Sequence, residues 1–186
     1  MGSYLMLYST IGRYSVGLAT LPEQVDAAVR MSTVVTEKID CDGDDSQYLA
    51  LTVREGGAES LLLVEGYYSP GPASGFNPGV LVVPETSVVF VGAGTSILCF
   101  SLAPITRLAR ERVEVGFWQW QRHGELVIMS AELEFSVWSS RGKKLWSLFV
   151  EPPWGFVVQG DEVVLDVMGD RQTFGLLSGE PRGAAL

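Results

Sequence analysis

Residues 79–102 read GVLVVPETSVVFVGAGTSILCFSL, and two later stretches of the chain repeat the same organisation. Residues 116–139 read GFWQWQRHGELVIMSAELEFSVWS, and residues 155–178 read GFVVQGDEVVLDVMGDRQTFGLLS. Each stretch opens with Gly and runs through three apolar segments separated by polar or Gly-containing turns, and the three starts lie 37 and then 39 residues apart. This recurrence predicts repeated antiparallel meanders.

A fourth strand-like segment follows each of the first two stretches. Residues 110–115 read RERVEV, and residues 143–150 read KKLWSLFV after a Gly-containing turn. Several runs, such as residues 88–91, carry apolar side chains at every position, which is typical of strands covered on both faces. We therefore predict an all-β chain, an antiparallel sandwich or propeller-like meander of about ten to twelve strands with one short N-terminal helix.

The first 78 residues are less regular. Residues 21–30 (LPEQVDAAVR) predict the helix, because Pro and acidic residues come early and Arg comes late. Residues 48–53 and 61–67 predict a hairpin, and a Pro/Gly/Ser-rich loop follows it. We expect one β domain over residues 1–186, in which residues 1–78 form an irregular first half and residues 79–183 form three meander repeats.

The segment Gly142-Lys143-Lys144-Leu145-Trp146 resembles the end of a blade in β-propellers built from pyrroloquinoline-quinone-enzyme-like repeats. Ser178-Gly179 is similar to its beginning in the next unit, and the resemblance extends over residues 79–183. It implies the strand order within each unit and no quinone site. Three units are fewer than the typically about four to eight blades of a closed propeller, so an open sandwich or barrel-like meander is favoured over a ring made by two chains.

Composition limits the classes of function. The chain is 47% hydrophobic and 19% charged, which predicts a folded protein, and its net charge is −9. An acidic chain argues against nucleic-acid binding and fits a basic protein partner. No apolar run approaches the roughly 20 residues of a membrane span, and no secretory signal is recognisable. We expect a cytoplasmic protein, and the sequence does not determine its oligomeric state.

The segments that resemble cofactor or metal motifs each lack a residue that the motif requires. Gly92-Ala93-Gly94 lacks the later small residue of a dinucleotide fingerprint, since position 97 is Ile, and it predicts a hairpin turn. The acidic turn at residues 40–45 could hold Ca²⁺, but it lacks the Glu of an EF-hand loop, so a solvated turn is favoured. His123 is the only histidine, too few for a zinc site. We expect no cofactor.

Two cysteines and a group of arginines could form a disulfide and a phosphate site, respectively. Cys41 and Cys99 could form one disulfide, but Cys99 lies in an apolar run that suits a buried free thiol. The group Arg107, Arg110 and Arg112 predicts a solvated strand face more than a phosphate site.

Candidate binding residues are aromatic and acidic. Trp118 and Trp120 are expected on one face of a strand by their spacing of two, where core packing is favoured over a binding surface. Glu132 and Glu134 are expected to alternate on a strand, as a carboxylate pair would require. The full set of candidates is Tyr67, Tyr68, Trp118, Trp120, Trp154, Glu132 and Glu134.

These residues predict a non-catalytic protein that binds a protein partner through loops rich in Tyr, Pro and Trp. An inhibitor of the immunity-protein type, which neutralises a basic toxin, would fit the charge. The alternative is a small-molecule or carbohydrate-binding module, or a carboxylate-based hydrolase.

Overall fold

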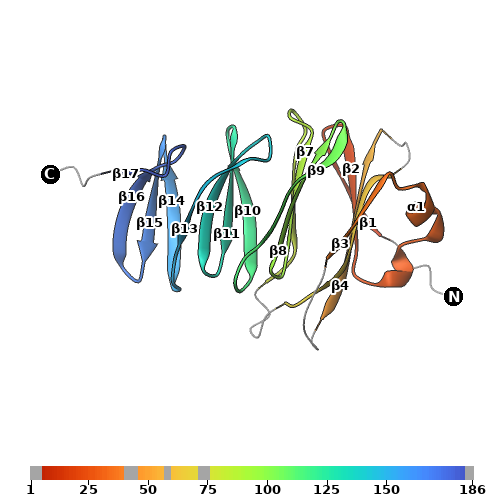
Figure 1. Cartoon of the computed structure of the whole chain (residues 1–186), viewed down its shortest axis with the longest axis horizontal. Helices are drawn as coiled ribbons and strands as arrows, with labels where there is room; N and C mark the ends of the chain where they lie inside the picture. The colour runs from red at the N-terminus through yellow and green to blue at the C-terminus, as the bar shows by residue number, and fades with distance from the viewer. Residues whose placement is uncertain (1–5, 40–45, 57–59, 71–75, 183–186) are drawn as a thin grey trace.

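The computed structural model describes residues 6–39, 46–56, 60–70 and 76–182, and these form four β-sheets arranged side by side in one row (Figure 1). The strands run across the row, and the helix lies at the N-terminal end of it. The acidic turn at residues 40–45, with Cys41, lies outside the described residues.

The N-terminal sheet has five strands in the order β1-β2-β4-β5-β3. Their bounds are β1 (Leu7–Ile11), β2 (Tyr14–Ala19), β3 (Val35–Ile39), β4 (Gln47–Glu55) and β5 (Ser60–Tyr68). β4 and β5 form the predicted hairpin, whereas β3 is parallel to β5 and reaches the sheet edge through a crossover. The crossover contains a 3₁₀ helix, η1 (Pro22–Gln24), and α1 (Ala27–Ser32).

One helix was expected over residues 21–30, and the structure divides this segment at Asp26. The Asp26 carboxylate accepts hydrogen bonds from the backbone N–H groups of Ala28 and Val29, so α1 begins at Ala27. The prediction of one short α-helix near the N-terminus is confirmed. Within the described part of the chain, no helix has the length and hydropathy of a membrane span.

Three four-stranded antiparallel meanders follow, each with its strands in chain order. The first contains β6 (Gly79–Val83), β7 (Val88–Ala93), β8 (Ser96–Leu102) and β9 (Ile105–Arg112). The second contains β10 (Phe117–His123), β11 (Leu126–Ala131), β12 (Glu134–Ser139) and β13 (Lys144–Phe149). The third contains β14 (Trp154–Gln159), β15 (Glu162–Val167), β16 (Asp170–Gly175) and β17 (Pro181–Arg182).

The all-β class and the propeller-like strand order within each unit are confirmed, because a four-stranded sheet of this kind is the unit of a propeller blade. Gly92-Ala93-Gly94 lies at the β7–β8 hairpin, as predicted, and Gly94 adopts the left-handed conformation that the tight turn requires (φ 55°). The described residues contain strands β1 to β17, more than the ten to twelve expected. The excess arises because the three meanders alone supply twelve.

Apolar cores fill the spaces between neighbouring sheets. The N-terminal sheet packs on the β6–β9 sheet, the β6–β9 sheet on the β10–β13 sheet, and the β10–β13 sheet on the β14–β17 sheet. On β7, Val89 contributes to the first core and Phe90 to the second, so the sequence correctly indicated strands covered on both faces. A smaller cluster that includes Val29 packs α1 onto the N-terminal sheet.

An ion-pair cluster also joins the first two sheets. The carboxylate of Glu37 on β3 accepts hydrogen bonds from Arg107 Nη1 at 2.8 and 3.0 Å and from Arg110 Nη1 at 2.6 Å. Glu37 is buried, and both arginines on β9 remain partly exposed. Two of the three arginines that the sequence assigned to a solvated strand face therefore also hold an inter-sheet contact.

Candidate functional site

Phe149, the last residue of β13, is 60% exposed and stands between two hollows. The smaller hollow, of about 210 Å³, is lined by Glu114, Glu134 and neighbouring residues of β13. The larger one, of about 380 Å³, lies between β13 and the β14–β17 sheet and includes Glu151 and Asp170 in its lining. We call this group, Phe149 with Glu114, Glu134, Glu151 and Asp170, the Phe149 site.

Strand pairing and core packing place Phe149 at this position. Phe149 lies opposite Glu134 in the β12–β13 register, which brings an acid beside the ring. Trp146 and Leu148 of the same strand pack into the core between the last two sheets, and Trp146 Nε1 donates to the carbonyl of Leu176 at 2.9 Å. β13 is thus fixed by its inward side chains, while Phe149 projects into solvent.

The lining of both hollows is acidic. Among the described residues that line them, four are Asp or Glu and none is Lys or Arg. The nearby Lys144 Nζ lies 2.7 Å from carboxylate oxygens of both Glu111 and Glu134. Burial opposes the charged form of Lys144, but the hydrogen bonds that Lys144 Nζ donates to Glu111 and Glu134 outweigh this effect and raise the pKa of Lys144. The Lys144 ammonium group is therefore already paired with two carboxylates.

Trp118 and Trp154 form an aromatic stack between the last two sheets, with ring centroids 5.2 Å apart and planes inclined by 18°. A β-bulge between Phe117 and Gln119 turns Trp118 towards β14. Trp120 instead packs on Phe90 of β7, at 5.2 Å, on the other side of the sheet. The expectation that Trp118 and Trp120 share a face is therefore wrong, because the bulge interrupts the alternation of the strand.

A third hollow, of about 230 Å³, lies at this stack and is lined by Trp118, Gln119, Gln121, Ser130, Trp154, Gly155 and Phe156. The hydroxyl of Ser130 is buried and has no hydrogen-bond partner among the described residues. Trp154 is held by its indole, since Nε1 donates to the carbonyl of Glu132 at 2.9 Å. The hollow thus combines aromatic surface with a few polar groups.

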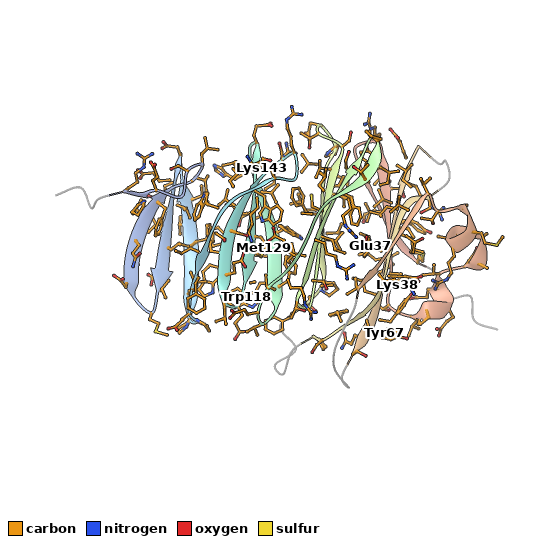
Figure 2. All side chains as sticks on the ribbon, in the orientation of Figure 1. Glu37, Lys38, Tyr67, Trp118, Met129 and Lys143 are labelled. Carbon is orange, nitrogen blue, oxygen red and sulfur yellow. The ribbon has the colours of Figure 1, made fainter. Side chains whose placement is uncertain are left out.

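The other candidates from the sequence do not join one site. Tyr67 is 48% exposed on β5, but its neighbour Tyr68 is buried and donates to Gln47 Oε1 at 3.0 Å, so Tyr68 is not the exposed contact residue that was expected. Both belong to β5 of the N-terminal sheet, where Tyr67 lies away from Trp118 (Figure 2) and Tyr68 joins the core between the first two sheets. Glu132 lies in the β11–β12 turn and Glu134 begins β12, so the two acids do not alternate on one strand.

Phe149, Glu114 and Asp170 were missed by reasoning from the sequence. The strand pattern of residues 143–150 was recognised, but the exposure of Phe149 depends on where the neighbouring sheet ends. Glu151 lies in the β13–β14 connection and Asp170 begins β16, so the two acids are brought together only by packing of the two sheets. The only signal in the sequence that could have indicated this site is the short spacing between an aromatic residue, Phe149, and an acid, Glu151.

Two further predictions concern metal binding and thiol chemistry. Within the described ranges, no group of three or more His, Cys, Asp or Glu side chains is arranged to hold a metal ion. Cys99 is a free thiol in the core between the β6–β9 and β10–β13 sheets, and burial raises its pKa to about 12. A thiol of this kind is a packing group rather than a nucleophile at neutral pH.

No protein-family model and no curated protein matches this chain. Solved structures with limited similarity include BamB from Moraxella catarrhalis, with 11% identity over 75% of this chain and 45% of that one at a TM-score of 0.44. HIRA(644-1017) is 11% identical, and the match covers 97% of this chain and 53% of that one at a TM-score of 0.45. The computationally designed Ika8 protein is 14% identical, and the match covers 94% of this chain and 59% of that one at a TM-score of 0.45. The chain spans less than two thirds of each of these structures.

Proposed function

We propose that this chain is a non-catalytic interaction protein that binds a basic protein partner at the Phe149 site. The observation that carries the proposal is an exposed aromatic ring, 60% accessible, between two hollows whose charged lining residues are all acids. Aromatic anchors beside a pocket are frequent hot spots of protein interfaces. An acidic rim selects against acidic partners and favours Lys and Arg.

The rest of the molecule suits this role. The chain carries a net charge of −9, which attracts a basic partner over a distance and speeds its association. The site sits where rigid β-sheets end, so little conformational freedom is lost when a partner binds. An inhibitor of a basic protein is one form that this activity would take, and a cytoplasmic location remains part of the proposal.

Selection of random peptides displayed on phage against the purified chain tests this function. We expect enriched peptides to combine Lys or Arg with an apolar residue, and to bind more weakly as salt increases. Synthetic versions of these peptides are then titrated by calorimetry. Phe149→Ala and Glu151→Lys are each expected to weaken binding by about tenfold or more.

Two matched variants provide the controls. Leu177→Ala removes an equally exposed apolar side chain, and Glu180→Lys makes the same charge change at an exposed acid outside the site. Neither is expected to change the affinity by more than about twofold. The proposal fails if the selected peptides bind all four variants equally, or if they are neither basic nor sensitive to salt.

A small-molecule-binding module is the second candidate, favoured by the buried, unpartnered hydroxyl of Ser130 beneath the Trp118–Trp154 stack. Thermal-shift screening with monosaccharides and other small polyols tests it. A stabilising ligand whose effect disappears in Ser130→Ala and Trp118→Ala would replace the first proposal. The carboxylate-based hydrolase is less favoured because Glu134 is engaged by Lys144, and full turnover by Glu132→Gln would eliminate it.

A further inference from the structure

We propose that the outer face of the β14–β17 sheet binds the same face of a second copy of this chain, giving a two-fold symmetric dimer. This surface lies on the opposite side of the β14–β17 sheet from the core that it shares with the β10–β13 sheet. It is separate from the Phe149 site in its side chains and in its proposed partner.

The two ends of the row of sheets differ. At the N-terminal end, α1 and Val25 cover part of the outer face of the first sheet through a cluster that includes Ala19, Ala50 and Leu63. At the other end, within the residues that the structure describes, no helix or strand packs on the outer face of the β14–β17 sheet (Figure 1). A head-to-tail row of copies would have to displace α1, whereas a pair of copies joined at the open face would not.

The register of the sheet defines this open face. Val157, Val164 and Thr173 lie side by side across β14, β15 and β16, and Gly155, Asp166 and Arg171 form the next row. A Cβ atom at Gly155 would have no heavy atom within 4 Å, which leaves a depression beside Asp166. The resulting groove has a volume of about 790 Å³, and Val157 is 57% exposed within it.

Met168 adds an apolar side chain at the rim. It lies in the β15–β16 turn with φ 54° and is 62% exposed. A left-handed backbone is unfavourable for a residue with a Cβ and a long side chain, and glycine would adopt it freely. The other such residue, Ser87, is compensated because its hydroxyl accepts a hydrogen bond from Arg13 Nη2 at 2.7 Å. Val167 pairs with Asp170, so Met168 and Gly169 form a two-residue hairpin loop that requires positive φ at both positions. The turn thereby holds the exposed Met168 side chain at the rim of the groove.

The charges on this face are balanced, although the chain as a whole is strongly acidic. Arg171 Nε lies 2.9 Å from Asp166 Oδ2, and Arg182 Nε lies 4.0 Å from Glu162 Oε1. Two-fold symmetry turns one copy relative to the other, so each acid of one face can meet a base of the other. The face is thus self-complementary, whereas contacts between the acidic surfaces elsewhere would be repulsive.

Sedimentation velocity of the full chain over about 1 μM to about 1 mM measures the association. We expect a species of twice the chain mass that dissociates on dilution. Val157→Arg places two cations on the apolar centre of the interface and is expected to weaken association by about tenfold or more. Met31→Arg, at an 87% exposed position on α1, is the matched control and should leave the dimer intact.

A charge-exchange pair tests the symmetry directly. Arg171→Asp gives a face with two neighbouring acids, and Asp166→Arg gives one with two neighbouring bases, so each variant alone should be monomeric. Mixed together, the two variants should form a heterodimer. A wild-type monomer at every concentration, a dimer that persists in Val157→Arg, or a mixture that fails to associate would each overturn the proposal. None of these outcomes depends on peptide binding at the Phe149 site.

Discussion

The N-terminal sheet and the three meanders are built from similar apolar strands but connected in different ways. In each meander every strand pairs with the next strand along the chain. In the N-terminal sheet, β3 is the edge strand and pairs with β5. β4, which follows β3 in the sequence, lies on the other side of β5. Local connection allows a repeated sequence pattern to specify the meanders, whereas the first sheet depends on a non-local, parallel contact.

The parallel pair β3–β5 is made possible by one glycine. Gly66 lies opposite Ile39 with φ 152°, and a Cβ at this position would overlap the carbonyl oxygen of Ile39. The irregular sheet therefore relies on one special backbone position, whereas the meanders rely on packing distributed over many residues. Three substitutions test this difference.

Trp138→Ala is expected to have the largest effect, because Trp138 is fully buried in the core between two meanders. Loss of such a side chain typically costs about 3–5 kcal/mol of unfolding free energy. Urea unfolding followed by fluorescence and by circular dichroism measures it. If the chain is one domain, Trp138→Ala and Leu51→Ala, in the N-terminal sheet, should shift the same single transition. Separate transitions would show that the two regions unfold independently.

Gly66→Ala is expected to destabilise the chain by about 2–4 kcal/mol, since the new methyl group would overlap backbone rather than a movable side chain. Gly155→Ala, where a Cβ meets no heavy atom within 4 Å, is the control and should change stability by less than about 1 kcal/mol. Chemical denaturation of both variants provides the values. Equal, small effects would mean that the β3–β5 pair contributes little to the fold.

Alkaline pH should produce the smallest of the three effects, and it acts on the N-terminal sheet. Burial, followed by a hydrogen bond to Glu65, raises the pKa of Tyr48 to about 12, so the folded state favours neutral Tyr48. The resulting stability is complete below the unfolded pKa of about 10 and is lost as pH rises through about 12. Tyr48→Phe should therefore reduce the decline in stability between pH 9 and pH 12, roughly the window set by these pKa values. An unchanged pH profile would contradict this assignment.

The same difference in connectivity explains what the sequence could predict. The recurrence of Gly, apolar runs and turns was enough to predict the meanders and their strand order, because each pairing is local. The parallel placement of β3 was not predictable, since nothing in residues 35–39 distinguishes an edge strand beside β5 from one beside β4. The helix predicted over residues 21–30 began too early, because Pro22 begins the separate 3₁₀ helix η1 and the Asp26 cap sets the start of α1.

The candidate site was less predictable than the fold. Trp118 and Trp154 were both among the candidate binding residues from the sequence, and the structure brings them together. Their geometry depends on a one-residue bulge in β10 that alternation alone does not reveal. Phe149 and its acids come from separate strands and connections, so their proximity depends on how two sheets pack. Sequence patterns within one strand carry no information about such a contact.

The arrangement of the sheets in a row also determines which sheet unfolds locally most easily. The β6–β9 and β10–β13 sheets each contribute side chains to two cores, whereas the β14–β17 sheet contributes to one. Amide hydrogen exchange should therefore be slowest in the middle of the row and faster towards β14–β17, because fewer buried contacts oppose local unfolding there. The larger hollow at Phe149 spans this boundary, so a bound partner would hold the more weakly anchored sheet against its better anchored neighbour.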